Sequence, residues 1–107
     1  MEEVPPAPPH SELVLHGPIT VENLASIKGV LLQHLLDVSG TCLIQAVGVT
    51  DLDSAGAQLL YAFVTAIARR AATVRWVTVS PSLLVSARAL GMDACLGLSQ
   101  GALARRR

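Results

Sequence analysis

The residues best placed to do chemistry are an aspartate and a serine in the short segment Asp53-Ser54-Ala55-Gly56. This segment lies between an apolar stretch and an alanine- and leucine-rich one, as expected where a buried strand leads into a helix. The free N–H groups at such a helix start favour a carboxylate or a phosphate. Ser54 is therefore a candidate phosphorylation site, where the added charge is stabilised by the helix end and opposed by Asp53. The alternative is that Asp53 or Ser54 simply caps the helix.

Other catalytic or ligand-binding patterns are absent from the sequence. Ser54 lacks a G-x-S-x-G turn and an evident histidine base, so a hydrolase triad is not indicated, and there is no phosphate-cradling G-x-x-x-x-G-K-[ST] segment. Cys42 and Cys95 have no CxxC spacing, and their apolar surroundings predict buried free thiols. The histidines form no ligand set with acids or with one another: His10, His16 and His34. We expect no enzymatic activity, no metal and no cofactor.

The elements that must position Ser54 follow from hydrophobic spacing. The expected strands are short and apolar, at 12–16, 41–47 and 73–79. The expected helices are one capped by Thr20 and ending at Ser39-Gly40, one over 57–70, one begun by Ser80-Pro81 and stopped by Gly91, and a short helix or turn within 92–98. Strands alternating with helices predict parallel pairing through right-handed crossovers.

Two stretches in this order resemble a known family. VGVTDLDSAGAQLL is a strand, a loop and D-S-A-G into an apolar helix, and VRWVTVSPSLLVSARALGM follows about 20 residues later. Together they resemble a STAS domain (sulfate transporter and anti-sigma-factor antagonist) over residues 13–96. The resemblance implies an α/β fold with a mixed, mostly parallel four- to five-stranded sheet and helices packed mainly on one face.

The resemblance also implies a function. Anti-sigma-factor antagonists of this family bind a serine kinase and are switched by phosphorylation at the second hydroxyl of a D-S-[ST]-G turn, whereas other STAS proteins act without that switch. Here Ala55 occupies the second position, and only Ser54 keeps a hydroxyl. The turn is also similar to those of STAS subunits of bacterial lipid-asymmetry ABC transporters and of STAS proteins in histidine-kinase signalling. The implied partners are a serine or histidine kinase, an anti-sigma factor, or an ABC transporter ATPase.

The helix after the turn provides a candidate docking surface. One face is apolar, and the opposite side, which includes Tyr61, carries few charges, as interface cores do. The apolar face consists of Leu59, Leu60, Phe63, Val64 and Ile67. The predicted partner-binding residues are Asp53, Ser54, Ala55, Gly56, Gln58, Tyr61, Ala62 and Thr65. The alternatives are a helix sandwiched within the fold and a homodimer contact.

Composition sets the remaining bounds. The length of 107 residues predicts one hydrophobic core. Because 51% of the residues are hydrophobic and only 15% are charged, so small a domain exposes apolar surface, which favours a permanent protein partner or self-association. A net charge of zero gives no general attraction to nucleic acid, and no apolar run is long enough to span a membrane. The acidic, proline-rich start does not resemble a secretory signal, so we expect a cytoplasmic protein. The expected organisation is a disordered segment over 1–10, a STAS domain over 11–98 and a flexible basic tail over 99–107.

Overall fold

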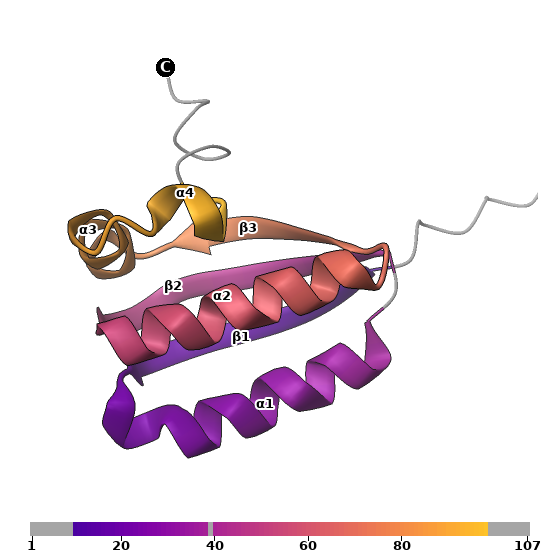
Figure 1. Ribbon diagram of the computed structural model, residues 1–107, viewed down its shortest axis with the longest axis horizontal. Coiled ribbons are helices and arrows are strands. Elements are labelled where there is room, and N and C mark those ends of the chain that lie inside the picture. Colours follow the sequence, from indigo (N-terminus) through magenta and orange to yellow (C-terminus); the bar gives the residue numbers. More distant parts are fainter. Residues whose placement is uncertain (1–9, 39, 99–107) are drawn as a thin grey trace, which may run out of the picture.

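A computed structural model describes residues 10–38 and 40–98 of the chain, so the start of the chain and the tail with Arg105–Arg107 lie outside the described residues. The described part is an alternating α/β fold (Figure 1). In chain order its elements are β1 (His10–Ile19), the 3-10 helix η1 (Val21–Asn23), α1 (Leu24–Asp37), β2 (Thr41–Leu52), α2 (Ser54–Arg69), β3 (Thr73–Val79), α3 (Pro81–Ala89) and α4 (Asp93–Leu96).

The three strands form one sheet in the order β1-β2-β3, and both pairings are parallel. The expectation of four to five strands is therefore wrong for the described residues, as is the expectation of a mixed sheet. The physical reason is that only three described segments have the apolar, β-branched pattern of a strand, and the segments between them have helical spacing. The larger number came from the family resemblance and not from the residues.

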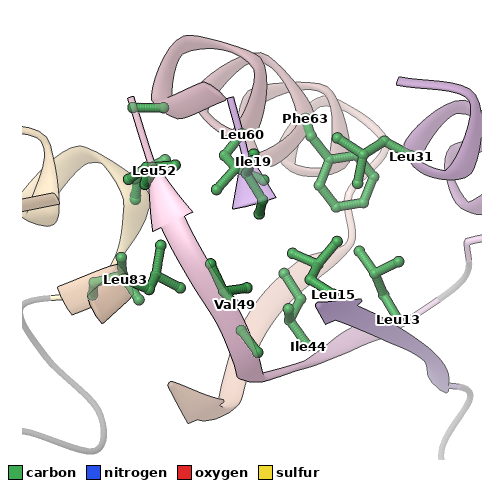
Figure 2. Packing of buried hydrophobic residues seen from close by; sticks show 14 of the residues in the cluster. Leu13, Leu15, Ile19, Leu31, Ile44, Val49, Leu52, Leu60, Phe63 and Leu83 are labelled. Carbon is green, nitrogen blue, oxygen red and sulfur yellow. The ribbon is translucent and has the colours of Figure 1, made fainter. Parts of the chain in front are cut away.

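Helices α1 and α2 cover one face of the sheet, with α2 lying along the strands (Figure 1). The core forms between these helices and the alternate strand residues that face them. Leu60 packs beside Ile19 below α2, and Phe63 lies beside Leu31 of α1 (Figure 2). Leu13, Ile44 and Ile67 are fully buried in the same cluster.

Two strands run further than their sequence pattern predicted. The first strand was expected over 12–16 with a turn at Gly17-Pro18, but these two residues lie inside β1, and β2 continues past its expected end at 47 to Leu52. The register of β1 with β2 shifts between Val14 and His16 and again between Gly17 and Pro18. These β-bulge-like irregularities let both strands continue through their glycines. β1 is an edge strand, where proline is tolerated because its missing N–H faces away from the neighbouring strand.

Helix α3 lies beside the carboxyl-terminal half of β2, where β3 has already ended. The Ser80 hydroxyl caps it by accepting from the Leu83 N–H at 3.0 Å, and Pro81 is its first residue, as predicted. Leu83 is fully buried and packs near Val49 and Leu52 of β2 (Figure 2). The helix therefore completes the core at the edge of the sheet that carries the Ser54 turn.

Candidate protein-binding site

The turn between β2 and α2 is held by the carboxylate of Asp53. Its Oδ1 accepts a hydrogen bond from the Gly56 N–H at 2.8 Å, which caps α2. Its Oδ2 accepts from the Val21 N–H at 2.9 Å, so the same side chain ties the start of α2 to the connection between β1 and α1. Of the two capping alternatives, the structure supports Asp53 and not Ser54.

These hydrogen bonds have an electrostatic consequence. The N–H groups of Gly56 and, next, Val21 stabilise the charged carboxylate and lower the pKa of Asp53 below its ordinary value. Asp53 is therefore ionised throughout the neutral range, and the cap is fully formed there.

Gly56 sets how closely the turn approaches β1. A Cβ at this position would lie 1.9 Å from the carbonyl oxygen of Ile19, far inside any real contact. The backbone of α2 therefore passes directly over the end of β1, and only glycine permits this approach. Sequence reasoning placed Gly56 in the site but missed this role, because the neighbouring strand end is known only from the pairing of β1 with β2.

Ser54 is the first residue of α2, and its side chain is exposed. No hydrogen bond involves its hydroxyl in the described part of the chain, because Asp53 provides the cap. Ala55 beside it is half-buried. A hydroxyl in this position is available to a second protein.

The outward side of α2 continues from this turn. Gln58 and Ala62 are exposed, Tyr61 is 46% exposed, and Thr65 is half-buried. The opposite side fills the core with Ala57, Leu60, Phe63 and Ile67, while Leu59 and Val64 are half-buried. The helix is therefore covered on one side and open on the other, which differs from the alternative of a helix sandwiched within the fold. All eight predicted partner-binding residues lie on this turn and helix, and Gly56 alone is buried.

Other groups that could do chemistry do not join this site. Among residues 10–38 and 40–98, no three His, Cys, Asp or Glu side chains gather as metal ligands. A ring nitrogen of His34 hydrogen-bonds the carbonyl oxygen of Glu12, so this histidine ties α1 to β1. Cys42 is buried, as predicted, but the prediction of a buried thiol is wrong for Cys95, which is exposed on α4.

The comparison with family models agrees with this architecture. Residues 5–100 match the family described as "Mlab, STAS domain", which is most of the chain. The chain therefore belongs to the STAS domain family, whose members are generally non-enzymatic regulatory modules that interact with proteins. No curated protein matches the chain at a significant level. Within the described residues, no helix has the length and apolar character needed to cross a bilayer.

Proposed function

We propose that this protein is a non-enzymatic regulatory module that binds another protein through the Asp53–Gly56 turn and the outward side of α2. One observation carries the proposal. Asp53 supplies the helix cap, which leaves the Ser54 hydroxyl exposed at the positive end of α2, next to a helix side that carries no charge from Gln58 to Thr65. Tyr61 is the natural anchor of such a contact, because tyrosine is enriched among the residues that dominate binding energy.

The charges around the turn favour a partner with basic side chains. Glu22 and Asp51 are exposed at the same edge of the sheet as Asp53, which hydrogen-bonds the N–H of Val21 beside Glu22. Acidic groups along one edge of an uncharged surface are complementary to a basic patch on a partner, which speeds association and fixes orientation. A cytoplasmic kinase or an anti-sigma factor with such a patch is the partner class that we propose.

Phosphorylation of Ser54 is the proposed switch. A serine kinase would transfer the γ-phosphoryl group of ATP to the Ser54 oxygen, whose proton is lost as ADP leaves. The phosphate would place about 1.5 to 2 negative charges beside Glu22, Asp51 and Asp53. Since the same edge is already acidic, the modified form should bind a basic partner differently from the unmodified form.

The experiment incubates purified protein with a candidate kinase and ATP and maps phosphate by mass spectrometry. Stoichiometric phosphate on Ser54, absent from Ser54→Ala, is the expected result for a switch. Binding is measured in parallel by calorimetry with Tyr61→Glu and with the control Leu36→Glu, an equally drastic change at the exposed far end of α1. The proposal predicts at least a tenfold weaker affinity for Tyr61→Glu only, corresponding to about 1.4 kcal/mol. Equal binding by both variants would exclude this surface.

A second candidate is a STAS subunit that assembles with and regulates an ABC transporter ATPase. Ala55 favours it, because the absence of a second hydroxyl is consistent with docking that needs no phosphorylation. Co-purification with an ATPase, lost when Ser54 or Tyr61 is replaced by glutamate and kept in Leu36→Glu, would support this candidate over signalling. Unchanged co-purification with all three variants would exclude it.

A further inference from the structure

The sheet has a second face, which α1 and α2 do not cover. Side chains alternate along each strand, and those opposite to the core residues Leu13, Ile44 and Trp76 point to this open face. Most of them are exposed, with Thr41, Leu43 and Gln45 half-buried. The set includes Glu12, Val14 and His16 on β1, Thr41, Leu43, Gln45 and Val47 on β2, and Thr73, Arg75 and Val77 on β3.

Each strand of the open face carries exposed apolar side chains. Val14 is 60% exposed, Val47 is 68% exposed and Val77 is 45% exposed, one on each strand. On the central strand, Gln45 is in register with Val14, and Leu43 lies two residues before it; both are half-buried. Apolar side chains on all three strands of an uncovered sheet are a feature of surfaces that pack against another layer.

The charges on this face have a specific arrangement. Glu12 of β1 is in register with Leu43 of β2, and Leu43 is in register with Arg75 of β3. One row across the sheet therefore carries an acid at one edge, a leucine in the centre and a base at the other edge. Both charged side chains are exposed. At two strand spacings, or about 9.6 Å between backbones, they flank Leu43.

This arrangement is complementary to itself under one symmetry operation. If a second copy packs face to face about a two-fold axis parallel to β2, its β3 lies over β1 and its β1 lies over β3. Glu12 of each copy then faces Arg75 of the other, and Leu43 faces Leu43. An axis perpendicular to the strands would instead place β1 over β1 and β3 over β3, so that like charges face each other.

We propose that the open face of the sheet is a homodimer interface, in which two copies pack with parallel strands about a two-fold axis along β2. The result is a four-layer arrangement, with the two sheets inside and the helices outside. Sheets packed in this aligned way lie about 10 Å apart at about −30°, which permits the interdigitation of the valines and Leu43. The interface is isologous, as in most soluble homo-oligomers.

The size of the face sets the expected affinity. Three strands about 4.8 Å apart and about seven residues long, at about 3.3 Å per residue, give a plan area of about 330 Å2. Counted on both copies this is about 660 Å2, and side-chain relief brings it at most to the low end of specific interfaces, which start at about 1,200 Å2. We therefore expect a weak dimer, with a dissociation constant of about 10 to 100 μM. The two Glu12–Arg75 pairs lie at the rim, and salt should weaken the dimer modestly.

The test is sedimentation equilibrium of the full chain from about 10 to 500 μM, a range that spans the expected constant. The proposal expects a monomer–dimer equilibrium. Val47→Glu should weaken association at least tenfold, whereas Leu36→Glu, a matched apolar-to-acid change on the helical side where 74% of the side chain is exposed, should not. Circular dichroism confirms that both variants remain folded.

A charge swap tests the symmetry itself. Glu12→Arg and Arg75→Glu should each weaken the dimer, and the double variant should restore it, because the opposite charges again face each other. A monomer at the highest concentration, a dimer that Val47→Glu leaves intact, or a double variant no better than the single ones would each overturn the proposal. So would loss of a different protein partner by Val47→Glu in a chain that stays monomeric. The Ser54 turn lies on the helical side, so Val47→Glu should leave the affinity of a single turn for one kinase or ATPase subunit unchanged, which separates this test from that of the proposed function.

Discussion

At the scale of single residues, Asp53 determines what the turn can do. Its two carboxylate oxygens accept the N–H groups of Gly56 and Val21, so one side chain both caps α2 and joins it to the start of the first helical segment. Because the aspartate makes these bonds, the neighbouring serine is released from capping. The chemistry of Ser54 thus depends on the hydrogen bonds of the residue before it.

The lowered pKa of Asp53 predicts a pH dependence of folding stability. A carboxyl group whose pKa is lower in the folded state contributes stability above its unfolded pKa, about 3.9, and loses that contribution as pH falls through the folded value. In the variant Asp53→Asn, the amide side chain can still cap the helix but does not titrate. We expect the wild type to be the more stable of the two at pH 6 to 7, and the difference in thermal midpoint to shrink steadily as pH falls from about 5 to 2. A constant difference over this range would contradict the prediction.

At the scale of elements, the approach of α2 to β1 depends on Gly56. Substitution by alanine would drive a methyl group into the backbone carbonyl of Ile19, which cannot move like a flexible side chain. We expect Gly56→Ala to destabilise the fold by about 3 kcal/mol or more, measured by urea unfolding.

Gly29 provides the matched control for this substitution. It lies within α1, and no heavy atom would lie within 4 Å of an added Cβ. Because alanine is the better helix former, Gly29→Ala should stabilise the fold by about 0.5 to 1 kcal/mol. Equal effects of the two substitutions would show that helix propensity, and not the contact with Ile19, governs Gly56.

The elements also show what the sequence could predict. β3 was predicted at its full length, because a short segment rich in β-branched residues and bounded by turn residues has few alternatives. The predicted start of α3 is confirmed for the same kind of reason, since a capping serine followed by proline is a local signal. β1 and β2 were predicted too short. Gly17 and Gly48 suggested strand ends, but a left-handed backbone at Gly17 and the close approach of His16 to Gly48 are features of a bulged pairing that only the neighbouring strand reveals.

The candidate site was predicted to a similar degree. The turn and the outward side of α2 followed from local spacing, and the structure places the expected residues there. The bond from Val21 to Asp53 could not be predicted, because it joins positions 32 residues apart whose proximity depends on the register of β1 with β2. The expected capping by Thr20 is not observed, since a 3-10 turn at Val21–Asn23 precedes α1.

At the scale of the whole molecule, the reactivities of the two thiols measure how accessible two different parts of the fold are to solvent. Cys42 is fully buried in the central strand, and burial raises the pKa of its thiol, whereas Cys95 is exposed on α4. Since only the thiolate reacts, an alkylating reagent at pH 8 should modify Cys95 rapidly and Cys42 only when the sheet opens.

This prediction is checked by mass spectrometry of peptides during labelling. We expect the rate at Cys42 to rise with urea in parallel with global unfolding and to rise further in Gly56→Ala, while the rate at Cys95 changes little. Cys95→Ser controls for assignment of the slow phase. Similar rates for both thiols in the native protein would mean that the central strand opens without global unfolding.

All strands of the sheet run in one direction, and this has a consequence for how a dimer would meet its target. A two-fold axis along β2 keeps the carboxyl-terminal edges of both sheets at the same end of the dimer. Two Ser54 turns would therefore face the same direction, and the dimer would be a bivalent ligand. A dimeric kinase or a pair of ATPase subunits could then bind both turns of one dimer. The second contact would form at the high local concentration created by the first. Avidity of this kind would make recognition respond steeply to the amount of protein present, even though each single contact is weak.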